Sequence, residues 1–92
     1  MSILVMTSEV NDRIADCSEF AKRVEDAIGK FHSRDWGDVY EGDKTQNDQD
    51  WEALENGAYG RVLASYPNNL GFDKFWIIRD TEATTILFPH EY

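Results

Sequence analysis

The sequence predicts a single α+β domain over residues 1–92, in which a small antiparallel sheet of three to four strands is covered on one face by two helices. Three observations predict this fold class. The chain has only 92 residues, a helical repeat of apolar residues fills its first third, and three short runs of β-branched and aromatic residues follow near its end. Helices and strands that are segregated along the chain in this way are typical of α+β domains.

The first predicted element is a short strand over Ile3–Met6, which is wholly apolar and is therefore expected to be buried. After it, the apolar residues follow alternating steps of four and three, which is the spacing of one face of a helix. This apolar stripe consists of Val10, Ile14, Cys17, Ala21, Val24, Ile28 and Phe31.

We expect one helix over residues 8–32, capped at its N-terminus by Thr7 or by the serine that follows it. The alternative is a break after Cys17, with Ser18 capping a second helix. We expect the stripe to pack on the chain's own sheet, because an apolar stripe on a helix usually forms part of a hydrophobic core. Its steps also fit a coiled-coil seam, so a homodimer through the Val10–Phe31 stripe is the alternative use.

A second helix is predicted to begin at Asp43, whose side chain is a good cap, and to end near Asn56. Gly57 follows directly and tolerates the positive φ that often ends a helix. Trp51 and Leu54 lie on the face of this helix that we expect to turn toward the core.

Three apolar runs follow this helix, and we predict strands over residues 61–66, 74–79 and 84–88. A cluster of Pro, Asn and Gly at residues 67–71 predicts a turn after the first run, and the short polar segment 80–83 joins the other two. Connections this short favour antiparallel pairing.

The negative charge of the chain is concentrated in one segment. Eighteen acids and nine bases give a net charge of −9, but residues 1–34 and 57–92 carry only −1 each. Residues 35–56 carry eight acids and one base, which is a net charge of −7. A field of this sign repels nucleic acid and anionic membranes, so we expect no direct nucleic-acid or membrane partner, and it attracts basic surfaces.

Three of these acids, Asp48, Glu52 and Glu55, are spaced four and three apart and form one carboxylate stripe on the predicted helix. Thirteen helical residues span about 20 Å, a length over which one DNA strand places about six phosphates. The segment is thus either a partial mimic of one nucleic-acid strand or simply a solvated face. The residues that we predict to bind a partner are Asp35, Trp36, Asp38, Glu41, Asp43, Asp48, Asp50, Glu52, Glu55 and Trp76.

The sequence contains no motif for catalysis, for a metal or for a cofactor, and we expect the protein to use none of them. The residues after Asp43 do not match a calcium loop. A zinc site that joined His32, His90 and Cys17 has no supporting spacing. A hydrolase that used His32 with Asp35 is the least favoured alternative, because no orienting motif accompanies the pair.

The N-terminal apolar run covers four residues, which is shorter than the core of a signal peptide or a membrane helix. A single cysteine excludes an internal disulfide framework. We therefore expect a cytoplasmic protein.

Two stretches of the chain resemble a known family. The first carries DWGD at Asp35–Asp38, and the second carries FWII at Phe75–Ile78 and ends in ATTILFPHEY at Ala83–Tyr92. Over roughly residues 31–92 they resemble a widespread family of small uncharacterised proteins that are encoded on bacterial plasmids and other mobile elements. The connection at residues 79–82 is shorter here than is usual in that family.

The resemblance implies a genomic setting and no established activity. Mobile elements commonly encode small proteins that blunt host defences, and acidic inhibitors of nucleic-acid-binding enzymes are frequent among them. We therefore expect a non-catalytic inhibitor of the anti-CRISPR or anti-restriction type, which binds the basic surface of a nucleic-acid-binding host protein or complex. The alternative is a dimerising or partner-binding module without an inhibitory role.

Overall fold

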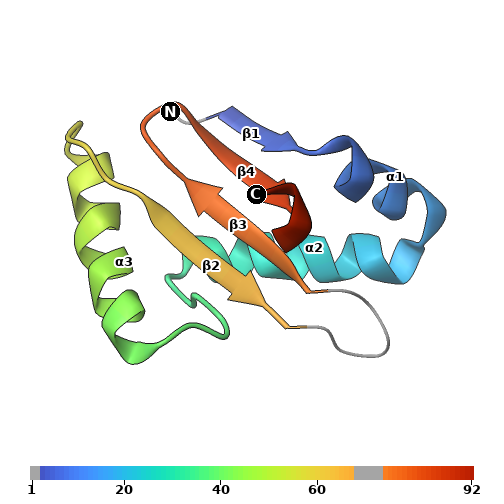
Figure 1. Ribbon diagram of the computed structural model, residues 1–92, viewed down its shortest axis with the longest axis horizontal. Helices are drawn as coiled ribbons and strands as arrows, with labels where there is room; N and C mark the ends of the chain where they lie inside the picture. The colour runs from blue at the N-terminus through green and yellow to red at the C-terminus, as the bar shows by residue number, and fades with distance from the viewer. Residues whose placement is uncertain (1–2, 68–73) are drawn as a thin grey trace.

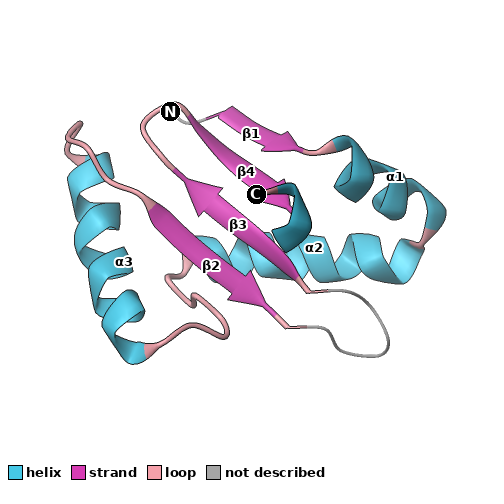
Figure 2. Cartoon of the chain, in the orientation of Figure 1, coloured by secondary structure: helices cyan, strands magenta, loops and turns pink. Residues whose placement is uncertain are grey.

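The structure is a computed structural model that describes residues 3–67 and 74–92, and within them it confirms the α+β class (Figures 1 and 2). Three helices, a four-stranded sheet and a short C-terminal 3-10 turn are described. In chain order the elements are β1 (Ile3–Met6), α1 (Ser8–Asp16), α2 (Ser18–His32), α3 (Glu41–Glu55), β2 (Val62–Tyr66), β3 (Phe75–Arg79), β4 (Ala83–Leu87) and η1 (Pro89–Glu91).

The sheet has the strand order β1-β4-β3-β2 and is mixed rather than purely antiparallel. The antiparallel pairing predicted for the last three strands is confirmed for β2 with β3 and for β3 with β4. β1 instead lies parallel to β4, with Met6 beside Ile86. Parallel neighbours need a long crossover, which the three helices supply. Apart from Pro67, the turn predicted at residues 67–71 lies outside the described residues.

The core lies between one face of the sheet and the helices, with α2 crossing behind the strands in Figure 1. The ring of Phe20 in α2 meets the ring of Phe75 in β3 edge-to-face, with centroids 5.6 Å apart. At the other end of α2, Phe31 meets Trp51 of α3 at 5.4 Å. Val10 of α1 is also fully buried, so all three helices contribute to one core. No helix among the described residues has both the length and the apolar character that a membrane crossing needs.

The single helix expected over residues 8–32 is wrong, because the chain breaks into α1 and α2 at Cys17. Cys17 is extended, with φ −140° and ψ 108°, and it caps α2 without a side-chain hydrogen bond. A straight helix of that length would extend about 37 Å, whereas strands of four or five residues are about 17 Å long. The break lets both pieces cover the short sheet. Thr7 caps α1 as predicted, with its Oγ1 accepting from the Val10 N–H at 3.3 Å.

The apolar stripe packs inside this chain rather than on a partner helix. Val10, Val24 and Phe31 are buried, while Ile14 and Cys17 pack against the core from its margin. The stripe therefore serves the fold, and we do not retain it as a dimer seam.

Two further expectations need correction. β1 has the predicted bounds, but it is an edge strand whose first three side chains are exposed, so it is not buried. α3 begins at Glu41 rather than at Asp43, with Tyr40 in the cap position and no side-chain cap hydrogen bond. Its predicted end is confirmed, since Asn56 is the C-cap and Gly57 follows with φ +79°.

Candidate protein-binding groove

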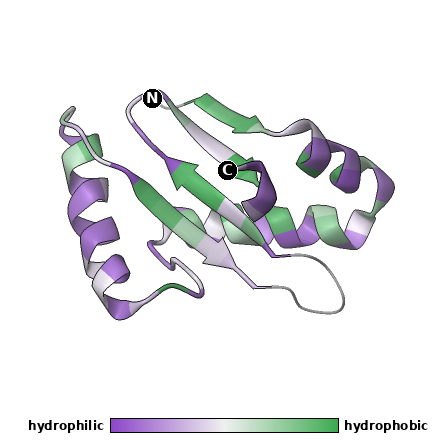
Figure 3. Cartoon of the chain, in the orientation of Figure 1, coloured by the Kyte–Doolittle hydropathy of each residue, from purple (hydrophilic) through white to green (hydrophobic). Residues whose placement is uncertain are grey.

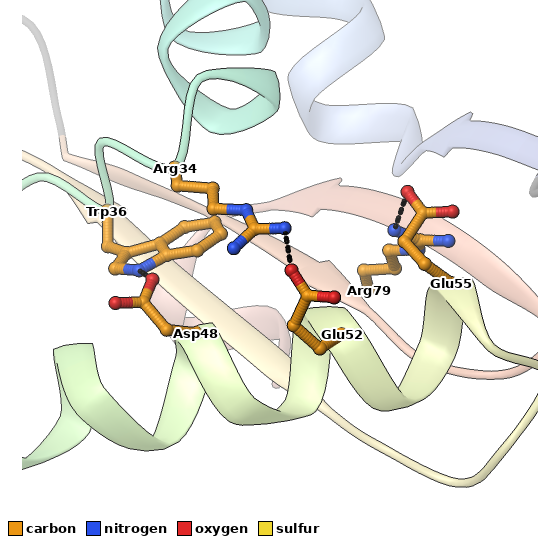
Figure 4. A network of polar contacts seen from close by, with 6 residues as sticks. All are labelled: Arg34, Trp36, Asp48, Glu52, Glu55 and Arg79. Carbon is orange, nitrogen blue, oxygen red and sulfur yellow. Dashed lines mark hydrogen bonds and ion pairs between the residues drawn. The ribbon is translucent and has the colours of Figure 1, made fainter.

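The carboxylate stripe of α3 contacts the chain's own polar groups instead of standing free (Figure 4). Asp48 Oδ1 accepts a hydrogen bond from the indole Nε1 of Trp36 at 3.0 Å. Glu52 forms a salt bridge with Arg34, which follows the end of α2 and has a positive φ of 63°. The first two members of the stripe thus attach α3 to the segment that precedes it.

Glu55, the third member, forms a salt bridge with Arg79 at the end of β3, with Nη1 and Oε1 3.3 Å apart. The guanidinium of Arg79 also lies over the ring of Trp51, 4.4 Å from its centroid. This arrangement fastens the C-terminal half of α3 to the sheet. Two of the three acids in the stripe are thus paired with cations of the same chain, and Asp48 accepts a hydrogen bond from Trp36.

Trp36, which we predicted to bind a partner, is instead part of the core, with 2% of its surface exposed. Its ring packs edge-to-face on Phe31 at 5.4 Å and lies 5.6 Å from the ring of Trp51. Because its N–H already donates to Asp48, neither its ring nor its donor is available to a partner. The prediction for Trp36 is therefore wrong.

The segment around Gly37 is fastened to the outer edge of β2 by backbone hydrogen bonds. Ser65 N–H donates to the Trp36 carbonyl at 3.0 Å, and Asp38 N–H donates to the Ser65 carbonyl at 2.7 Å. Gly37 has φ +74°, and a Cβ at this position would lie 2.1 Å from the Ser65 carbonyl oxygen. Only glycine therefore allows the approach.

A tyrosine supports the same segment from the inner face of the sheet. The Tyr66 hydroxyl donates to the Asp35 carbonyl at 3.0 Å. Burial, and secondly the charge of Asp35, raises the pKa of Tyr66, so the hydroxyl remains a donor throughout the physiological pH range.

The rest of the β2 edge is occupied by one side chain of α3. Asn47 is 5% exposed, and its Nδ2 donates to the Leu63 carbonyl at 2.9 Å. Its Oδ1 accepts from the Leu63 N–H at 3.2 Å. The amide therefore imitates the backbone of a neighbouring strand and holds the N-terminal half of α3 beside β2.

These attachments leave two cavities between the start of α3 and the face of the sheet opposite α2. They have volumes of about 360 and 280 Å³ and share the residues Val39, Asp43 and Leu63, so we treat them as one docking groove. Its lining combines apolar and aromatic side chains with polar and charged ones, including two carboxylates, which we call its rim. The groove is lined by Asp38, Val39, Tyr40, Asp43, Gln46, Asn47, Arg61, Leu63, Ser65, Lys74, Trp76 and Tyr92.

Two aromatic side chains, Trp76 and Tyr92, lie on the wall formed by the sheet. Phe75 is fully buried while Trp76 is half-buried, because neighbouring residues of a strand point to opposite faces. The ring of Trp76 packs edge-to-face on Tyr92 at 5.6 Å. Arg61 lies over the Tyr92 ring at 4.9 Å and also contacts its hydroxyl. Tyr92 thus contacts both β3 and the residue that precedes β2, at one end of the groove.

Two rim carboxylates, Asp38 and Asp43, are exposed, and neither forms an ion pair with any described side chain. Two cations, Arg61 and Lys74, also line the groove, and among the described residues neither forms an ion pair. The lining thus carries two carboxylates and two cations, and its carboxylates belong to a segment, residues 35–43, that has four acids and no base. Its carboxylates lie beside the exposed ring of Tyr40, of which 84% is accessible.

The structure brings together three of the residues predicted to bind a partner, namely Asp38, Asp43 and Trp76. The other predicted acids lie outside the groove lining and have local contacts. Asp35 accepts from the Gly37 N–H at 3.2 Å, Glu41 pairs with Lys44 at 3.2 Å, and Asp50 accepts from Gln46 at 3.0 Å.

Sequence reasoning missed the apolar and aromatic part of the groove. Strand alternation carries a signal for Leu63, because it lies between two core positions and so must face outward. No local signal places Tyr92 on Trp76, since that contact depends on how η1 returns over the sheet.

One group of metal-ligating side chains is present in the described residues, at the meeting point of the two ends of the domain. The donor atoms of Glu9, His90 and Glu91 lie within 4.8 Å of one another. These side chains already connect the start of α1 to η1. His90 Nε2 lies 2.6 Å from Glu9 Oε2, and Glu91 Oε1 accepts a hydrogen bond from the Thr7 hydroxyl at 2.7 Å. Neither Cys17 nor His32 belongs to this group.

His32 and Asp35 do not form a catalytic pair in the described structure. His32 Nδ1 contacts the Ile28 carbonyl at 2.9 Å, and Asp35 is committed to the Gly37 N–H.

Comparison with known proteins gives no match. No protein-family model, no curated protein and no solved structure matches the chain. The resemblance of residues 31–92 to proteins of mobile elements therefore stays a prediction. We therefore infer the function from the side chains that line the docking groove.

Proposed function

We propose that the protein is a non-catalytic protein-binding module that docks, through its groove, on a basic surface of a nucleic-acid-binding protein and inhibits that protein. The observation that carries this proposal is the juxtaposition of Asp38 and Asp43, which lack ion-pair partners among the described residues, with the aromatic ring of Trp76 in one open groove.

The groove combines the two kinds of group that recognise a basic side chain. Carboxylates form charge-assisted hydrogen bonds with a guanidinium or an ammonium group. Aromatic faces such as those of Tyr40 and Trp76 attract the same cations, and the apolar floor of Val39 and Leu63 accommodates their aliphatic stems. We infer that an arginine or lysine side chain of the partner enters the groove.

The proposal places the docking surface at the start of α3 and not on its carboxylate stripe. Residues 35–43 carry four acids and no base, and two of these acids, Asp38 and Asp43, line the groove. The stripe carries three acids, but each of these contacts a donor or a cation of the same chain. A partner would have to displace those contacts to use the stripe.

Inhibition follows from competition for the same basic residues. A nucleic-acid-binding surface offers lysine and arginine side chains that otherwise contact phosphates. An acidic protein that occupies them excludes the nucleic acid without any chemistry of its own. High salt screens both interactions, so inhibition is expected to weaken as ionic strength rises.

The proposal is tested by measuring DNA cleavage by a panel of purified restriction and CRISPR nucleases in the presence of the protein. We expect inhibition of at least one nuclease by the unmodified protein. The Asp38→Asn/Asp43→Asn variant is expected to lose most of this inhibition. A matched control, Asp12→Asn/Glu25→Gln, changes the net charge equally at exposed positions on α1 and α2 and should inhibit normally.

Two results would contradict the proposal. If no nuclease is inhibited, the inhibitory role is wrong. If both variants lose inhibition equally, the overall charge of the protein acts and the groove does not.

A further inference from the structure

The two edges of the sheet differ in how they are protected. On the β2 edge, Ser65 exchanges backbone hydrogen bonds with Trp36 and Asp38, and Leu63 does so with the amide of Asn47. β1 forms the opposite edge, and its outer side pairs with no strand in the described part of the chain (Figure 1). One edge is therefore closed and the other is open.

The open edge is apolar. Ile3, Leu4 and Val5 are 66%, 47% and 40% exposed, and Figure 3 shows β1 as a hydrophobic strand at the margin of the sheet. Natural edge strands are usually guarded by charged residues, proline or a bulge, because their free backbone groups pair readily with other strands. β1 contains neither a charged residue nor a proline.

We propose that β1 pairs antiparallel with β1 of a second copy of this chain, which joins the two sheets edge to edge. Two copies of a chain with a net charge of −9 repel each other over most of their surface. Residues 1–8 carry no charged side chain, so the β1 edge is the place where a second copy meets the least repulsion. The closed β2 edge stops further addition, so the assembly ends as a two-fold symmetric dimer.

The hydrogen bonds of β1 determine which of its residues can pair with the second copy. Thr7 N–H donates to the Ile86 carbonyl on the β4 side. Successive residues of a strand direct their backbone groups to opposite sides, so Leu4 and Met6 direct theirs outward. Pairing Leu4 of one copy with Met6 of the other is the two-fold register in which both outward residues find partners inside β1, and its axis passes between the two Val5 residues.

This register places the two Val5 residues in a non-hydrogen-bonded pair, with Cα atoms about 4.5 Å apart. Ile3 lies opposite Thr7 of the second copy, so the two Ile3 residues are about 13 Å apart along the strands. The docking groove lies at the β2 side of each copy and stays open in the dimer. The pairing is therefore independent of the proposed function.

Disulfide trapping tests the register directly. Val5→Cys and Ile3→Cys are each made together with Cys17→Ser, which removes the native thiol, and both proteins are oxidised by glutathione disulfide. Val5→Cys is expected to form a covalent dimer at least about tenfold faster than Ile3→Cys, because only its Cα separation fits a disulfide. Equal rates, or faster trapping of the more exposed Ile3→Cys, would overturn the proposal.

Sedimentation equilibrium tests the association without a cross-link. The unmodified chain is expected to be a dimer. Leu4→Pro removes an outward N–H and leaves the β4 ladder intact, so it should keep the circular dichroism spectrum and weaken dimerisation about tenfold or more. A monomer at every concentration of the unmodified chain, or unchanged dimerisation in a folded Leu4→Pro variant, would overturn the proposal.

Discussion

Among single residues, Gly37 has the largest influence on where the acidic segment lies. Its positive φ and its approach to the Ser65 carbonyl bring Asp38 to the rim of the groove. The DWGD motif thus has a structural meaning, since the glycine permits the contact and Trp36 anchors the segment in the core. The sequence shows that Gly37 can adopt a positive φ, but the β2 edge that requires it is 28 residues away.

Gly37→Ala should lower the free energy of unfolding by about 2 kcal/mol or more, because the added Cβ meets a backbone oxygen and the φ is unfavourable for alanine. Urea denaturation measures the change. Gly42→Ala is the matched control, since its Cβ meets nothing within 4 Å and alanine suits the helix. A stability for Gly37→Ala equal to that of Gly42→Ala would contradict the assignment.

Asp80 makes the turn between β3 and β4 sensitive to pH. Its Oδ1 accepts from the N–H groups of Ala83 at 2.9 Å and Glu82 at 2.8 Å, and these bonds lower the pKa of Asp80. The pKa of Asp80 is lower in the folded than in the unfolded protein, so its ionised form stabilises the fold when the pH is above the unfolded-state pKa. This stabilisation is lost as the pH falls through the folded-state pKa. Asp80→Ala should therefore destabilise the protein at pH 7, and the difference should shrink in acid, as thermal unfolding over a pH series would show. A difference that is constant with pH would contradict this role.

At the scale of elements, periodic patterns predicted most of the fold. The three consecutive strands, their antiparallel pairing and the end of α3 follow from local alternation and turn residues. The sequence indicates the break at Cys17 only as an alternative to one long helix, because the apolar steps continue through it without a change of phase. The sequence pattern also does not predict that β1 pairs parallel with β4, since this pairing depends on the path of the helices between the two strands.

The place of α3 depends on Asn47, a residue that helix periodicity does not single out. Asn47→Ala should cost about 2–3 kcal/mol of unfolding free energy, because it leaves the Leu63 N–H and carbonyl without their partner. Denaturant unfolding measures this cost. Asn47→Asp places a buried carboxylate oxygen against the Leu63 carbonyl, so at pH 7 its loss is expected to be at least as large as that of Asn47→Ala. An Asn47→Ala variant as stable as the parent would show that the amide does not hold α3.

At the scale of the whole molecule, the charge of residues 35–56 divides into two functional parts. The C-terminal part, with Glu52 and Glu55, forms ion pairs that fasten α3 to the rest of the chain. The N-terminal part, with Asp38 and Asp43, borders an open groove. The sequence predicted where the negative charge is concentrated, but it could not show which carboxylates face cations of the same fold, because Arg34 and Arg79 arrive from other elements.

The central claim is that the groove, and not the helix stripe, binds a basic partner. The most direct measurement is the affinity of the protein for an arginine-rich peptide, determined by isothermal titration calorimetry at low and at physiological salt. Three proteins are compared: the unmodified chain, Asp38→Asn/Asp43→Asn in the groove, and Glu52→Gln/Glu55→Gln in the stripe, which removes the same charge. The account predicts that the groove variant binds about tenfold more weakly or worse, and that the stripe variant binds within about twofold of the unmodified chain. Equal weakening of both variants, or a larger effect of the stripe variant, would contradict it.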